Sequence, residues 1–172
     1  MKLPKDEFIS NELFSLVIQA ALGRSKTYKE KLTEVQHKAF RDGFHKILDS
    51  MVIEYEQPVS SDRHIENIRC LSDDVSAKYS EYLHENCFRI GSAQKALNLY
   101  LKYLWCLNKI PCPPHCPFDA IIINRLRPDE TINWTEFDSI AIYKKLVDMA
   151  HKAANGEPIA EWELNEYNKN SN

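Results

Sequence analysis

The chain has 172 residues, of which 44% are hydrophobic and 27% are charged, and its formal net charge is −3. This length supports one compact domain with a substantial core and is too short for two ordinary domains. The 4 glycines and 8 prolines are too few for a fibrous, collagen-like or low-complexity disordered protein. We therefore expect a single domain over residues 1–172, and the scarcity of turn glycines argues against a β-sandwich or barrel.

The sequence carries no uninterrupted apolar run of about eighteen residues, and residues 1–6 lack the apolar stretch of a signal peptide. Its 5 cysteines form no regular framework, which favours free thiols in a reducing compartment. We therefore predict a cytoplasmic protein without a membrane partner.

Apolar residues recur at helical spacing through most of the chain, which predicts an all-α fold of about six or seven helices. A first helix is expected from about Asp6 to Leu22, with Gly23 as its stop. A long second helix is expected to begin at Ser25 or Thr27 and to close at Pro58. Within it, Gly43 indicates a kink or a close contact between helices.

The pattern from residue 60 predicts a third helix capped by Ser60 or Ser61, which the doublet Asp73-Asp74 interrupts. After a short link, a helix from about Ser92 to Leu107 is apolar nearly all round. A helix of that kind belongs at the centre of a domain.

The segment 110–117 contains four prolines and cannot be helical, so we expect a rigid surface loop. Residues 120–126 then form a short helix or strand with buried isoleucines. A helix beginning at Thr135 or Asp138 ends at Gly156, and a last helix runs from Pro158 to about Tyr167. Residues 168–172 are expected to be a frayed tail.

The charges are distributed unevenly. Residues 88–128 carry six basic residues and one acidic residue, a net charge of +5, between segments of −3 (residues 1–87) and −5 (residues 129–172). This block is the first place to expect a polyanion site, and chance fluctuation over such a span is the alternative. The acidic carboxy-terminal segment is in turn a candidate contact for a protein partner.

The basic block also holds the residues best suited to chemistry. Gly91 feeds the start of a helix, where exposed backbone N–H groups can bind phosphate. One turn later, Lys95 sits on an otherwise apolar helix, as a buried lysine nucleophile does. Asp119 leaves the stiff proline loop at the start of a segment, so it is either a positioned catalytic carboxylate or a helix cap.

Residues 88–126 resemble the catalytic part of the helix-hairpin-helix DNA glycosylases. In that family a glycine-containing hairpin binds the DNA backbone, a Lys-x-x-Asn pattern follows on a buried helix, and a downstream Pro-x-Asp supplies an aspartate. The corresponding positions here are Gly91, Lys95, Asn98, Pro117 and Asp119. The hairpin lacks the proline and second glycine usual in the family, and no cysteine follows Cys116 to hold the iron–sulfur cluster of some members.

The resemblance implies that the protein binds duplex DNA and excises a damaged or modified base that it has flipped out of the stack. Asp119 would stabilise the developing oxocarbenium charge or activate the nucleophile, and Lys95 would form a Schiff base in a bifunctional enzyme. It implies no cofactor. The residues expected to contact nucleic acid are Arg89, Gly91, Ser92, Gln94, His115 and Arg125.

Two other interpretations stay open. A zinc site could use Cys106, Cys112, His115 and Cys116, although their spacing does not follow paired Cys-x2-4-Cys knuckles. Without metal, Cys106 is expected to be buried, whereas Cys112 and Cys116 are expected to be partly exposed. The second interpretation is a non-catalytic helical protein that acts by binding other proteins.

Overall fold

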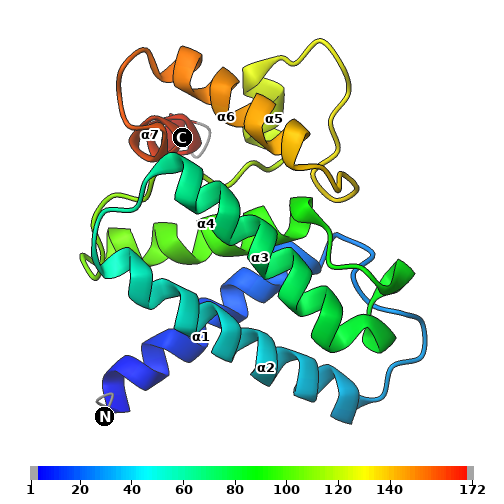
Figure 1. Cartoon of the computed structure of the whole chain (residues 1–172). Helices are drawn as coiled ribbons and strands as arrows, with labels where there is room; N and C mark the ends of the chain where they lie inside the picture. Colours follow the sequence, from blue (N-terminus) through cyan, green and yellow to red (C-terminus); the bar gives the residue numbers. More distant parts are fainter. Residues whose placement is uncertain (1–3, 170–172) are drawn as a thin grey trace.

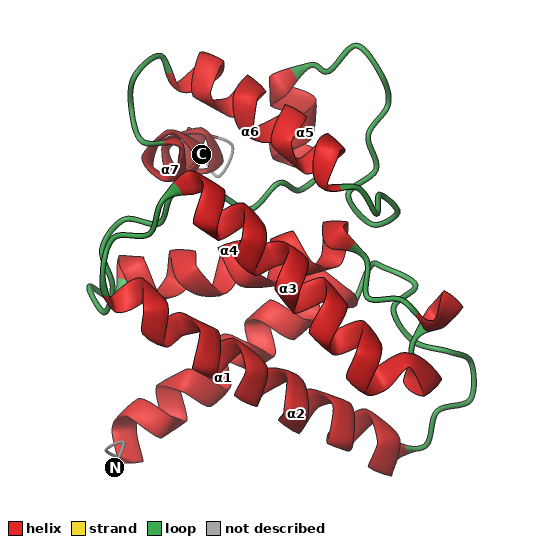
Figure 2. Ribbon diagram, viewed as in Figure 1, coloured by secondary structure: helices red, strands yellow, loops and turns green. Residues whose placement is uncertain are grey.

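Within residues 4–169, which the computed structural model describes, the chain forms seven α-helices and three short 3₁₀ helices (Figure 1, Figure 2). The predicted all-α, single-domain fold is confirmed. No helix of this part of the chain is long and apolar enough to cross a membrane. The α-helices are α1 (Pro4–Leu22), α2 (Glu34–Val52), α3 (Ser61–Tyr79), α4 (Ile90–Cys106), α5 (Ala120–Leu126), α6 (Ile140–Ala154) and α7 (Ile159–Lys169).

The first three helices differ from the prediction at α2. This helix begins at Glu34 and not at residue 25 or 27, because Thr33 and Gln36 form a reciprocal capping box. The residues before it form turns instead, and Tyr28 makes an isolated antiparallel bridge with Leu83. The predicted Ser60 cap of α3 is confirmed, whereas the predicted interruption at residues 73–74 is wrong because α3 continues to Tyr79.

Gly43 marks a close contact between helices. A Cβ atom at this position would lie 1.6 Å from the hydroxyl oxygen of Tyr79 on α3, so glycine leaves the space that the end of this side chain occupies.

Helix α4 is the centre of the fold, as its composition predicts. Every residue from Ile90 to Leu101 is buried. The helix packs against α1, α3 and α6. In Figure 1, α5, α6 and α7 gather at the top of the molecule, while α1 and α2 lie toward the opposite end.

The second half of the proline segment lies in the core, which corrects the expected surface loop, whereas Pro111 is exposed. The side chains of His115, Cys116 and Phe118 are all almost completely buried, and Pro113 and Pro117 are buried with them. The loop therefore carries its residues through the interior to the start of α5.

The last two helices lie close to their predicted positions. Helix α6 is capped by Ser139, whose side chain accepts a hydrogen bond from the Ile142 backbone N–H. Asp138, one of the two predicted starts, instead accepts a hydrogen bond from the Ile90 backbone N–H of α4 at 2.9 Å. Helix α7 extends to Lys169, so the expected tail is helical over residues 168–169, and residues 170–172 lie outside the described part of the chain.

Candidate active-site cleft

A cleft of about 810 Å³ lies beside α4, bounded by the end of α1, the start of α5 and α7. Its volume is within the roughly 300–1,000 Å³ of small-molecule sites. The hydrophobic part of its wall includes Leu16, Leu99 and Ile121. Its charged and aromatic lining residues are Arg24, Lys95, Lys102, Tyr103, Asp119, Trp134, Glu163 and Tyr167.

Lys95 and Asp119, the two residues predicted to be catalytic, meet in this cleft. The Lys95 ammonium donates a hydrogen bond to Asp119 Oδ2 at 2.8 Å, and the two side chains are 8% and 23% exposed. The ammonium also lies 5.7 Å from the ring centroid of Trp134, within the range of a cation–π contact. The fold thus brings together two groups that are distant in sequence.

Asp119 is a helix cap as well as an ion-pair partner. Its second oxygen, Oδ1, accepts a hydrogen bond from the Ile122 backbone N–H at 3.1 Å at the start of α5. Burial raises the pKa of Asp119, but the nearby Lys95 charge and the hydrogen bonds from Lys95 and the α5 backbone outweigh burial and lower it. The carboxylate is therefore ionised at neutral pH and fixed in position from two sides.

A second buried ion pair, absent from the sequence-based set, lines the same cleft. Lys102 donates to both carboxylate oxygens of Glu163 at 2.7 and 3.0 Å, and these side chains are only 12% and 3% exposed. The Lys102 ammonium also lies 4.8 Å from the ring centroid of Tyr167. Burial raises the pKa of Glu163, against the lowering effect of Lys102.

Two sequence signals could have indicated this pair. Lys102 follows Lys95 by seven positions, so both lie on nearly the same face of one helix. Glu163 follows the buried Ile159 by four positions, which places it on the inward face of α7.

The residues expected to form a DNA-binding hairpin do not form one. Gly91 is the second residue of α4, and its N–H donates to the Phe137 carbonyl at 3.0 Å. A Cβ atom at Gly91 would lie 2.0 Å from the Trp134 carbonyl oxygen. The space beside this glycine is therefore filled by the backbone of a protein loop and not by a phosphate. Ser92 is 4% exposed beside it. Neither residue is therefore exposed for the predicted contact with nucleic acid.

Gln94 and His115, which are also predicted to contact nucleic acid, are both 0% exposed in the fold. Gln94 bonds the Phe118 backbone in both directions, at 2.8 and 3.1 Å, which holds the proline loop onto α4. His115 bonds Tyr143 of α6 through Nδ1 and Ser61 of α3 through Nε2. These side chains position the loop that carries Asp119.

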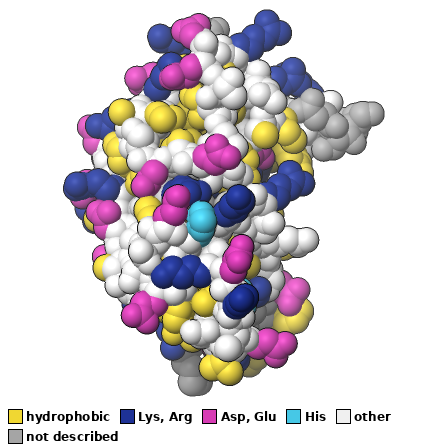
Figure 3. Space-filling view, turned by 90° about the vertical axis from the view of Figure 1, so that its right-hand side faces the viewer, with side chains coloured by type: hydrophobic (Ala, Val, Ile, Leu, Met, Phe, Trp, Pro, Cys, Tyr) yellow, Lys and Arg dark blue, Asp and Glu magenta, His cyan; other side chains and the backbone are white. Residues whose placement is uncertain are grey.

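The positive block does not form a free basic face. Five of its six cations pair with carboxylates within the described chain: Arg89 with Glu85, Lys95 with Asp119, Lys102 with Glu163, Lys109 with Asp6 and Arg125 with Glu166. On the face shown in Figure 3, Lys and Arg side chains lie interspersed with Asp and Glu. The expectation of a polyanion surface over residues 88–128 is corrected accordingly.

The four residues of the alternative zinc site do not assemble. Within residues 4–169, no three His, Cys, Asp or Glu side chains gather as metal ligands. Cys106 is exposed at the end of α4 and Cys116 is buried in the loop, the reverse of their expected exposures. Cys112 is half-buried, as expected.

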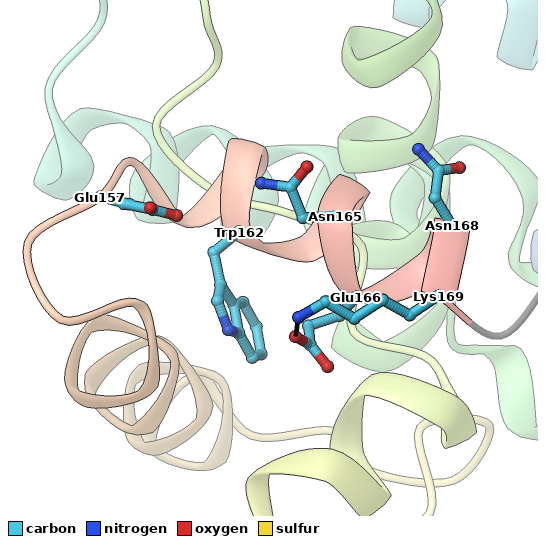
Figure 4. Close-up of a pocket in the computed structure, with 6 residues that line it drawn as sticks. All are labelled: Glu157, Trp162, Asn165, Glu166, Asn168 and Lys169. Carbon is cyan, nitrogen blue, oxygen red and sulfur yellow. Dashed lines mark hydrogen bonds and ion pairs between the residues drawn. The ribbon is translucent and has the colours of Figure 1, made fainter.

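A smaller hollow on α7 contains none of the predicted residues. It is lined by Trp162, Asn165, Glu166, Asn168 and Lys169, together with Glu157 before the helix (Figure 4). Glu166 and Lys169 form an ion pair across it at 2.6 Å.

No protein-family model, curated protein or solved structure matches the chain.

Proposed function

We propose that the protein is a base-excision enzyme, similar in chemistry to the DNA glycosylases, that hydrolyses an N-glycosidic bond in the cleft beside α4. The observation that carries the proposal is the pair Lys95 and Asp119, which meet at 2.8 Å in a cleft large enough for one nucleoside. An extruded nucleotide is the form in which such an enzyme reaches the bond, because the stacked duplex hides it.

Hydrolysis assigns the main role to Asp119. As the bond from the sugar carbon C1′ to the base nitrogen breaks, its electron pair leaves with the base and positive charge develops on the sugar. The ionised carboxylate stabilises that charge and accepts a proton from the attacking water. The two donors that hold Asp119 keep it ionised before the reaction.

A second branch uses Lys95 as the nucleophile. Lys95 first transfers a proton to Asp119 across their hydrogen bond, and its nitrogen then attacks C1′ and expels the base. The sugar ring opens and a Schiff base remains on the lysine. This branch predicts a covalent adduct that borohydride reduces and traps.

The test is base release from a panel of oligonucleotides, as duplex and as single strand, that contain uracil, hypoxanthine, 8-oxoguanine or 7-methylguanine. Strand cleavage after alkali reports excision. Asp119→Asn should lower turnover by about 100-fold or more, in the range of lost acid–base catalysis, and should retain binding. The variant Glu130→Gln, outside the cleft, is the matched control.

Unchanged turnover in Asp119→Asn would overturn the proposal. No release from any substrate, with no affinity for DNA even at low salt, would favour the non-catalytic protein-binding alternative, because phosphate contacts are strongest at low salt. The paired state of the positive block leads us to expect weak non-specific DNA binding in any case.

A further inference from the structure

The charges that line the cleft beside α4 do not balance. Of the residues that the structure describes, three cations and two carboxylates line it. Two of the cations pair with the two carboxylates: Lys95 with Asp119, and Lys102 with Glu163. The remaining cation is Arg24, in the turn that follows α1. The lining therefore has one positive charge in excess, which suits a ligand group that carries one negative charge.

The guanidinium of Arg24 has no structural role that would occupy it. The side chain is exposed, and within residues 4–169 it forms no hydrogen bond and no ion pair. The end of α1 does not need it as a cap, because the Ser25 hydroxyl contacts the Ala21 and Leu22 carbonyls at 3.2 and 3.4 Å. A guanidinium keeps its charge at every physiological pH, so a permanent cation faces the cleft without a partner from the described chain.

Arg24 lies at the end of the cleft that holds the catalytic pair. Helix α1 meets the middle of α4, where Ser10 hydrogen-bonds Tyr100 at 3.1 Å. Farther along the chain, the bridge between Tyr28 and Leu83 brings the segment after Arg24 beside the link that leads into α4. Between these two contacts, Arg24 lies toward the amino-terminal half of α4, which also carries the lysine of the catalytic pair.

A phosphodiester fits this position in charge and in shape. It carries one negative charge, and a planar guanidinium can donate two parallel hydrogen bonds to its oxygens. Elsewhere in the cleft, Asp119 and Glu163 would repel a phosphate, so the unpaired cation is the place where it can bind. Tyr103, about two helical turns beyond Lys95 on α4, provides a ring on which a base can stack.

We propose that Arg24 binds the phosphodiester next to the extruded nucleotide, an inference that rests on the proposed function. Arg24 then positions the substrate and takes no part in breaking the bond. The ligand class is a nucleotide within a strand. A free nucleoside lacks the phosphate, and a nucleoside monophosphate carries close to two negative charges, one more than Arg24 balances.

The experiment measures binding without turnover. The full-length chain is titrated with a duplex that contains a tetrahydrofuran abasic-site analogue, which has no base to release. In two further duplexes, the phosphate on the 5′ or the 3′ side of the analogue is replaced by an uncharged methylphosphonate. The proteins are the wild type, Arg24→Gln, Arg24→Lys and, as the matched control, Arg69→Gln, which changes an exposed arginine of α3 outside the cleft.

The wild type should lose about tenfold or more in affinity from one of the two methylphosphonates, the loss of a charged hydrogen bond. Arg24→Gln should show the same loss on the ordinary duplex and no further loss from that methylphosphonate, because the two changes remove one contact. Its affinity should also depend less on salt, with the slope of log affinity against log salt smaller by about one. Arg24→Lys, which keeps the charge without the planar fork, should recover part of the affinity, and Arg69→Gln should resemble the wild type.

Independent losses from Arg24→Gln and from both methylphosphonates would overturn the inference, as would wild-type affinity in Arg24→Gln or no binding of the abasic duplex. Base release by the wild type would in each case leave the proposed function standing. Binding of deoxyinosine 5′-monophosphate that depends on Arg24, when duplex binding does not, would assign Arg24 to a free nucleotide and overturn the inference. Coupling of Arg24 to one phosphate without release of any base would support the phosphate site and reject the excision chemistry.

Discussion

His64 and His115 lie ring against ring in the core, with centroids 4.7 Å apart and an interplanar angle of 87°. Both are 0% exposed, and hydrogen bonds occupy all four ring nitrogens. His64 of α3 hydrogen-bonds Tyr55 and Asn98 of α4. His115 of the proline loop hydrogen-bonds Ser61 of α3 and Tyr143 of α6. This network fixes the loop from which Asp119 projects.

The histidine pair predicts that the fold weakens in mild acid. Burial lowers the pKa of His64 from 6.5 to about 4, and burial lowers that of His115 further. Because the unfolded chain binds the protons more readily, stability is fully present above pH 6.5 and falls as the pH drops toward 4. Each histidine contributes a slope of up to about 1.4 kcal/mol per pH unit.

The measurement is the free energy of unfolding in urea across this pH range. His64→Asn should be less stable at neutral pH and should show a flatter dependence, by roughly one proton. His84→Asn, outside the network, should keep the wild-type slope. An unchanged slope in His64→Asn would contradict the assignment.

The two roles of Asp119 can be separated by substitution. Asparagine is a good helix cap without charge, so Asp119→Asn should lose only the ion pair, whereas Asp119→Ala should lose the cap as well. We expect Asp119→Ala to be less stable than Asp119→Asn by about 1 kcal/mol in chemical unfolding. Equal stabilities would show that the cap contributes nothing.

The buried pair Lys102–Glu163 predicts strong coupling between α4 and α7. Lys102→Met leaves a buried carboxylate without its partner, which costs about 3–5 kcal/mol. Replacing both residues by leucine should be less harmful than either single change, because no uncompensated charge remains. The exposed pair of Lys109 and Asp6 is the control, and Lys109→Met should cost less than about 1 kcal/mol. If the losses in free energy of unfolding from the two single changes added up in the double variant, the coupling between Lys102 and Glu163 would be excluded.

Helical periodicity predicted most of the fold because it reports directly on which face of a helix is buried. It located α4 at the centre, and local chemistry narrowed the cap of α3 to Ser60 or Ser61, of which the structure shows Ser60. It failed at residues 25–33, where the chain forms turns around the single bridge between Tyr28 and Leu83. That partner lies more than fifty positions away, and no local pattern encodes it.

The candidate site was predicted in part for the same reason. Lys95 and Asp119 stood out because a charge on an apolar helix and a carboxylate after a rigid loop are unusual in sequence. The second carboxylate, Glu163, was missed because a glutamate on an amphipathic helix is usual, and its four-residue spacing from Ile159 was a weak signal that it faces inward. The net charge of residues 88–128 predicted a basic surface that the structure does not form, because a charge count does not show which cations are paired with carboxylates.

The last prediction concerns Gly91, where the resemblance and the structure disagree. If Gly91 contacted DNA, Gly91→Ala would weaken DNA binding and leave the fold intact. In the structure, the new Cβ would meet the Trp134 carbonyl at 2.0 Å, and backbone cannot move aside as a flexible side chain can. We therefore expect Gly91→Ala to lower the free energy of unfolding by about 3 kcal/mol, at the upper end of the cost of overpacking.

The same clash should push the loop of residues 134–138 away from α4, because Gly91 and Ile90 both donate hydrogen bonds to this loop. Trp134, 5% exposed in the native chain, should then become accessible to a fluorescence quencher. Gly156→Ala, where a Cβ meets no atom within 4 Å but φ is +97°, should show a smaller loss from strain and no change in quenching. A stable Gly91→Ala protein with a shielded Trp134 would contradict the predicted clash with the Trp134 carbonyl.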